Sequence, residues 1–204
     1  MITPTLLKQF LIISDQVDAR ELTVILNELE RLLARGRQGN IVELGCYVGT
    51  TSLFIRRLMN EYKVTDEFHV YDSFAGLPEK TPQDISVAGD QFVAGALYAS
   101  RRTLLETFKK SHLEPPIVHK GWFSDLVSED MPDGILFAFL DGDYYESIRD
   151  SLKLVENKLL PGAVIIVDDY ASEALPGAAA AADEWASRKG HRVQSMASLG
   201  IIRT

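Results

Sequence analysis

The chain has 204 residues, 46% of them hydrophobic and 25% charged, and a formal net charge of −8. These values predict one globular domain over residues 1–204 and exclude a chain that is disordered throughout. The acidic charge argues against a nucleic-acid surface, which needs a basic face, and against binding to anionic membranes. One cysteine, Cys46, permits no internal disulfide, and no apolar segment reaches the ~20 residues of a membrane span, so we expect a cytoplasmic protein.

Hydrophobic periodicity predicts the elements of the first third of the chain. Residues 18–35 carry apolar side chains at helical spacing, and Asp18 and Glu21 can form a capping box at the start of this helix. We therefore expect residues 1–36 to form a helical extension at the N-terminal end of the domain. The chain continues with a buried strand at Asn40–Gly45, a helix that includes Leu53–Met59, and a second strand at Phe68–Tyr71.

The segment Ser73–Tyr98 has no regular pattern and is rich in glycine and proline. A connection of this length inside a compact domain is usually a functional loop, unless it contains a helix that the pattern does not reveal. We interpret residues 73–98 as a candidate lid over a binding site.

Strands and helices alternate in the rest of the chain, and this alternation predicts a doubly wound α/β fold. Most strands should be parallel and buried, with a terminal antiparallel hairpin. In such sheets, ligands bind at the carboxyl ends of the strands. The predicted elements are a helix from Ser100, strands at Ile117–His119, Ile135–Leu140 and Ala163–Val167, helices at Tyr145–Leu159 and Pro176–Lys189, and a hairpin of Arg192–Met196 with Ile201–Arg203.

A glycine turn follows the first strand. Gly45 and Gly49 allow a tight turn and a close approach of backbone to ligand. The spacing and Tyr47 do not fit a dinucleotide motif, and Glu43 suits an amine better than a pyrophosphate. Asp72, at the end of the second strand, is placed to accept the hydroxyls of a ribose. Each feature alone also fits an ordinary turn, but together they indicate a site for a nucleoside that carries an amino acid.

Carboxylates gather after the fourth and fifth predicted strands. Asp141 and Asp143 follow one strand, and Asp168 and Asp169 follow the next. Helix caps and turns explain one acid in each loop, but not several. If the strands are neighbours, Asp141, Asp168 and Asp169 converge and repel one another unless a cation lies between them. Oxygen ligands favour Mg²⁺, or else Mn²⁺ or Ca²⁺.

His119, Trp122 and Phe123 are weaker candidates. His119 ends a predicted strand at the edge of the site, where it is a second candidate for a catalytic base. The two aromatic side chains can stack on an adenine or pack in the core, and the sequence does not decide between these roles.

Five motifs, in this order, resemble the macrocin-type (TylF-like) O-methyltransferases. The resemblance covers about Ile41–Tyr170 and excludes residues 79–98. It implies a class I, Rossmann-like methyltransferase that uses S-adenosylmethionine and Mg²⁺. The motifs are VELGCYVGTTS, VYDSFAGLPE, HKGWFSD, LDGDYYESIRDSL and LLPGAVIIVDDY.

The resemblance also implies roles for individual residues. Asp143 would be the general base. The methionine end of the cofactor would contact Glu43, Gly45, Tyr47, Gly49, Thr50 and Thr51. The ribose would contact Asp72 and Ser73, and the adenine Gly121, Trp122 and Phe123. The metal would be bound by Asp141, Asp168 and Asp169, and Asp141 would also border the cofactor.

The sequence therefore predicts Mg²⁺-dependent methyl transfer from S-adenosylmethionine to a hydroxyl of a sugar or glycosylated metabolite. Two alternatives stay open: another small-molecule O-methyltransferase, such as a catechol-type enzyme, and a non-catalytic cofactor-binding domain. Tyr47 and the carboxylates disfavour a nicotinamide dehydrogenase. The partner is a small-molecule hydroxyl acceptor of unassigned identity, and the sequence leaves open whether the chain forms a homo-oligomer.

Overall fold

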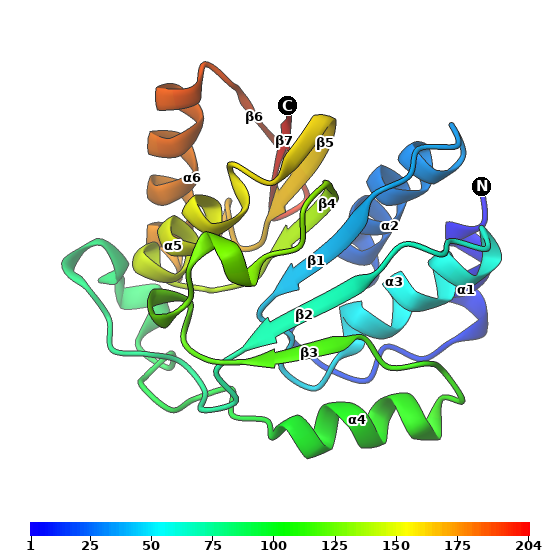
Figure 1. The fold of residues 1–204 in the computed structure, drawn as a ribbon. Coiled ribbons are helices and arrows are strands. Elements are labelled where there is room, and N and C mark those ends of the chain that lie inside the picture. The colour runs from blue at the N-terminus through cyan, green and yellow to red at the C-terminus, as the bar shows by residue number, and fades with distance from the viewer.

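A computed structural model of the chain describes residues 1–204 and contains one seven-stranded sheet (Figure 1). The strand order is β3-β2-β1-β4-β5-β7-β6, the first five strands are parallel, and β7 is antiparallel to both of its neighbours. The predicted fold class is confirmed. The strands are β1 (Asn40–Leu44), β2 (Phe68–Asp72), β3 (Ile117–Lys120), β4 (Ile135–Leu140), β5 (Leu159–Val167), β6 (Val193–Met196) and β7 (Leu199–Arg203).

Helices cover both faces of the sheet, because the central strands are apolar on both sides. Successive residues such as Ile41 and Val42 belong to two different core clusters. One cluster packs under α2 and α3, and the other under α5 and α6, on the opposite face (Figure 1). The helices are α1 (Thr3–Gln9), α2 (Ala19–Leu33), α3 (Thr50–Glu61), α4 (Arg101–Lys110), α5 (Tyr145–Val155) and α6 (Pro176–Lys189). None of them combines the length and apolar character that crossing a membrane requires.

The N-terminal residues form part of the core. The capping box is confirmed: Asp18 Oδ1 accepts the Glu21 N–H at 2.9 Å, and Glu21 Oε2 accepts the Asp18 N–H at 2.7 Å. The apolar face of α2 packs on the sheet. Helix α1 was not predicted, and its start is held by buried Glu30, which accepts the Thr3 Oγ1–H at 2.7 Å and the Tyr62 O–H at 2.9 Å.

The predicted end of α5 and the predicted start of β5 are wrong. The helix expected to reach Leu159 ends at Val155, and β5 begins at Leu159 rather than at Ala163. Leu159 pairs with Ile135 on β4, and the register shifts before the pairing resumes further along the strand. Pro161 and Gly162 lie within this irregularity, which is where a strand tolerates such residues.

Residues 73–98, here called the lid segment, fold over the carboxyl ends of the strands without an α-helix. They contain two short 3₁₀ turns, Pro82–Asp84 and Val87–Gly89. Leu77 packs with Tyr144 and Leu175, which precede α5 and α6. The segment, drawn in teal and green at the left of Figure 1, is thus an ordered loop attached to the starts of two helices.

Candidate active site

A pocket with a volume of about 200 Å³ lies at the carboxyl ends of the parallel strands. Its walls come from the glycine turn after β1, the end of β2, the lid segment, the turn after β3, and the loops after β4 and β5. No lysine, arginine or histidine lines it. The acidic lining residues are Asp72, Glu79, Asp141, Asp143, Glu146, Asp150, Asp168 and Asp169.

The glycine turn forms one wall of the pocket. Gly45 has φ of +93°, and a Cβ atom there would lie 1.8 Å from the carbonyl oxygen of Asp141. Only glycine therefore lets the ends of β1 and β4 approach this closely. Tyr47 lines the pocket with φ of +47°, and Gly49, with φ of +89°, precedes the first residue of α3.

Asp72 braces this turn from the neighbouring strand. Its Oδ2 accepts the Cys46 N–H at 2.9 Å, and its Oδ1 accepts the Phe74 N–H at 2.7 Å. The carboxylate also lines the pocket beside Ser73. The bracing role was not predicted, since the sequence indicated only a contact of Asp72 with a ribose.

Glu43, Thr50 and Thr51 are buried beneath the turn and do not line the pocket. Glu43 accepts a hydrogen bond from the Ser52 hydroxyl of α3. Burial, together with the smaller effect of the nearby Asp72 charge, raises the pKa of Glu43 to about 8. These residues support the turn from below, and direct contact with a ligand in the pocket would require rearrangement.

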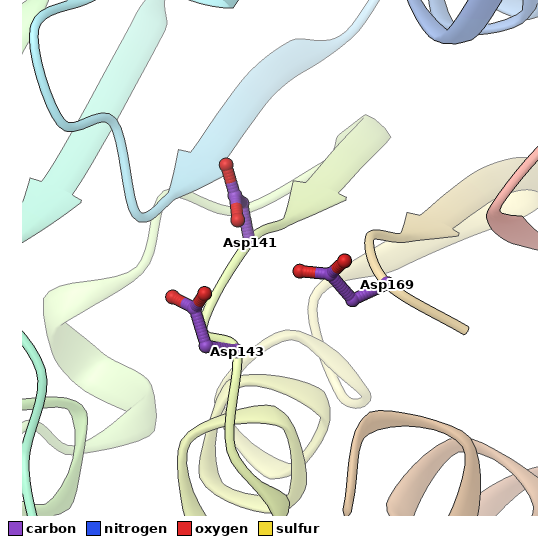
Figure 2. Close-up of side chains that lie close together, drawn as sticks. All are labelled: Asp141, Asp143 and Asp169. Atoms are coloured by element: carbon purple, nitrogen blue, oxygen red, sulfur yellow. The ribbon is translucent and has the colours of Figure 1, made fainter. Parts of the chain in front are cut away.

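Three carboxylates meet on the opposite wall. Oxygen atoms of Asp141, Asp143 and Asp169 lie within 4.8 Å of one another, and Figure 2 shows the side chains directed into a common space. Asp143 and Asp169 have left-handed backbones, with φ of +60° and +55°, a conformation that is strained in residues other than glycine. Asp168 is buried and lines the same pocket, but it lies outside this closest set.

No basic side chain in the pocket lining balances these acids. Burial raises the pKa of Asp141 well above its usual value, and Asp168, Asp143 and Asp169 raise it further by repulsion. Burial and the smaller repulsion from Asp169 and Asp72 raise the pKa of Asp143 to about 8. Burial and repulsion from Glu21 raise the pKa of Asp169 to about 6. A set of oxygen donors with excess negative charge fits a hard divalent cation.

His119 does not reach the pocket. It pairs in register with Tyr71 on β2, stacks on the Tyr71 ring at 4.2 Å between centroids, and has its Nε2 3.0 Å from Nδ1 of His69. Burial lowers the pKa of His119, and the neighbouring His69 lowers it further. The strand continues to Lys120, so His119 lies within β3 and not at its carboxyl end.

Comparison with known proteins identifies the family. Residues 15–197 match the sequence profile of the family described as Macrocin-O-methyltransferase (TylF). The chain belongs to this family. The match includes all five motifs identified in the sequence.

Two named relatives show how similar the chain is to known proteins. It is 32% identical to the 8-demethyl-8-(2,3-dimethoxy-alpha-L-rhamnosyl)-tetracenomycin-C 4'-O-methyltransferase of Streptomyces olivaceus, over 72% of this chain and 58% of that protein. It is 30% identical to the Mycinamicin III 3''-O-methyltransferase of Micromonospora griseorubida, over 72% of this chain and 61% of that protein. The chain thus spans about three fifths of the length of these relatives.

A solved structure confirms the fold. The O-methyltransferase NovP superposes with a TM-score of 0.80 at 23% identity, over 92% of this chain and 80% of that one. At this identity the likeness concerns the fold alone.

Several lining residues of this macrocin-O-methyltransferase family member were predicted and others were missed. Gly121, Trp122 and Phe123 line the pocket as expected, and the Trp122 side chain is partly exposed. Gln16, between α1 and α2, also lines it, and no pattern in the sequence marks that residue. Other missed residues include Leu77, Phe92 and Leu97 of the lid segment and Glu146, Ser147 and Asp150 of α5.

Proposed function

We propose that this protein transfers the methyl group of S-adenosylmethionine to a hydroxyl of a sugar or glycosylated metabolite, with Mg²⁺ bound by the carboxylates. The observation that carries the proposal is the pocket itself, in which a glycine turn faces three converging carboxylates. Family membership and a relative named for a rhamnosyl compound support the reaction and the acceptor class.

The charge of the pocket supports the choice of cofactor. S-adenosylmethionine carries a positive sulfonium and an ammonium group, which an acidic lining attracts. A pyrophosphate cofactor would instead meet carboxylates with no lysine or arginine to balance its charge. The backbone of the glycine turn, with Asp72 and Ser73, would hold the amino-acid end and the ribose, and Trp122 and Phe123 would flank the adenine.

The carboxylate cluster fits Mg²⁺ because all of its donors are oxygen atoms. When bound, the cation would lower the pKa of an acceptor hydroxyl and orient it. Asp143 would accept the proton released from that hydroxyl, since it lies in the pocket wall within the cluster of carboxylates that would hold the cation. The lid segment would exclude water from the reacting groups.

Two assignments of the acids are distinct. In one, Asp141, Asp168 and Asp169 bind the metal and Asp143 is the base. In the other, Asp143 is itself a ligand, as its place in the closest set suggests. The change Asp143→Asn separates them: a base variant keeps its affinity for Mn²⁺ and loses about 10²–10⁴-fold in turnover, whereas a ligand variant loses both.

The test of the whole proposal has two parts. Calorimetry should detect binding of S-adenosylmethionine in the presence of Mg²⁺. Methyl transfer should then be measured on a panel of glycosides and catechols with a radiolabelled methyl donor, and EDTA should abolish it while leaving cofactor binding largely intact. Tight NAD binding, absence of cofactor binding, or full activity in EDTA would contradict the proposal. A preference for catechols over glycosides would show that the acceptor is a catechol and not a sugar hydroxyl.

A further inference from the structure

Asp84 is a fully buried carboxylate of the lid segment, with 0% of its surface exposed. Its Oδ2 accepts the Thr81 N–H at 2.9 Å and the Thr81 Oγ1–H at 2.6 Å, within the first 3₁₀ turn. Its Oδ1 accepts the N–H of Tyr145 at 2.7 Å, 61 residues further along the chain. One side chain thus connects the lid segment to the first residue of α5.

The starts of α5 and α6 both lack a side-chain cap of their own. The residues before them, Tyr144 and Leu175, contribute no side-chain hydrogen bond that caps the helix. Asp84 supplies this function to α5. It also lies against the start of α6, because a Cβ at Gly177 would be 1.9 Å from Asp84 Oδ1. Two helix N-termini, each with a partial positive charge, therefore surround one buried carboxylate.

The same two helix starts follow the acidic loops of the pocket. Tyr145 comes two residues after Asp143, and α6 begins after the loop that carries Asp168 and Asp169. The lid segment is attached there a second time, since the Tyr144 hydroxyl donates to the Phe92 carbonyl at 3.1 Å. A displacement of Asp84 would therefore shift the Asp143 turn and the lid segment together.

We propose that Asp84 is a positioning residue, which fixes the turn bearing Asp143 and locks the lid segment over the pocket. The expected effect of Asp84 on metal and cofactor binding rests on the proposed function. Its attachment of the lid segment to α5 does not rest on that function. Asp84 itself does not line the pocket and contacts no reacting group.

The test compares Asp84→Ala and Asp84→Asn with a matched control, Glu30→Ala. Glu30 is also a buried acid that holds a distant segment, α1, and it does not line the pocket. Binding of Mn²⁺ is measured by electron paramagnetic resonance. Cleavage in the lid segment is measured with chymotrypsin, which has sites there at Phe92 and Tyr98.

We expect Asp84→Ala to weaken Mn²⁺ binding by about 10-fold, the scale of second-shell changes at metal sites, and to accelerate cleavage of the lid segment. Asp84→Asn should recover part of both properties, because its amide oxygen can still accept the Tyr145 N–H but its amide nitrogen faces the Thr81 donor. Glu30→Ala should change neither property, although its thermal stability falls.

Wild-type cleavage rates in Asp84→Ala would overturn the hold on the lid segment. Unchanged Mn²⁺ affinity in Asp84→Ala, or an equal loss of Mn²⁺ affinity in Glu30→Ala, would contradict the proposal that Asp84 positions the Asp143 turn. If the wild-type protein binds neither Mn²⁺ nor S-adenosylhomocysteine, the proposed function fails, and the chymotrypsin comparison still decides whether Asp84 holds the lid segment.

Discussion

Glu43 illustrates how burial changes the chemistry of a single residue. The sequence predicted that it holds the amine of a ligand, but it is 1% exposed and bonded to Ser52. Its pKa of about 8 lies above the value of an exposed carboxyl group. The folded protein therefore keeps a proton on Glu43 that the unfolded chain releases near pH 4–5, so this group costs increasing stability as the pH rises towards about 8.

The change Glu43→Gln should remove this cost. The amide keeps an oxygen that accepts the Ser52 hydroxyl, and it cannot ionise. We expect the free energy of unfolding to match the wild type near pH 5 and to exceed it by on the order of 2–4 kcal/mol near pH 9. Thermal or urea unfolding at several pH values measures the difference, and parallel pH profiles for the two proteins would contradict it.

Gly45 allows a prediction in which backbone strain and steric clash can be separated. Gly45→Ala would place a Cβ 1.8 Å from the carbonyl of Asp141 in a residue with φ of +93°. We expect a loss of at least about 3 kcal/mol in unfolding free energy. Gly36→Ala is the matched control, because it has φ of +70° but no atom within 4 Å, and it should lose only about 1–2 kcal/mol. Equal losses would show that the contact with Asp141 does not matter.

At the scale of elements, local signals were sufficient where they were strong. The capping box fixed the start of α2, and the continuous apolar run Ile135–Leu140 matches β4 from end to end. Helix α1 escaped prediction because its seven residues have too few turns to show a period. The start of β5 was missed because Leu159 pairs with a strand 24 residues earlier, which is a tertiary contact that no local pattern records.

The lid segment can now be tested as an element. Leu77, Phe92 and Leu97 line the pocket, so a ligand there should stabilise the segment in its present position. We expect S-adenosylhomocysteine with Mg²⁺ to slow chymotrypsin cleavage between residues 73 and 98, while cleavage elsewhere keeps its rate. Identical cleavage patterns with and without these ligands would mean that the segment is a fixed wall and not a lid.

At the scale of the whole molecule, the strand order creates the site. The sequence showed that acids follow several strands, but not which strands are neighbours. The order β2-β1-β4-β5 places Asp72, the glycine turn and the two acidic loops side by side along one edge. His119 lies outside this group, because its position along β3, and not its chemistry, places it against Tyr71.

Concentrating so many carboxylates in one pocket destabilises the metal-free protein by mutual repulsion, and a divalent cation should reverse this effect. We expect Mg²⁺ at about 100 times its dissociation constant to raise the free energy of unfolding by about 2.7 kcal/mol. For a chain of this size the corresponding rise in Tm is about 5–10 °C. Thermal unfolding with MgCl₂, and then with excess EDTA, measures the gain and its reversal.

The control must separate specific binding from general screening of a chain with net charge −8. Asp169→Asn removes a cluster carboxylate and should abolish most of the Mg²⁺-dependent rise in Tm. Glu106→Gln removes an exposed carboxylate of α4 that pairs with Arg102, far along the chain from the acidic loops, and should retain the full rise. Because both changes alter the net charge equally, an equal response to Mg²⁺ in the two variants would show that the cation acts by screening and does not bind the carboxylate cluster.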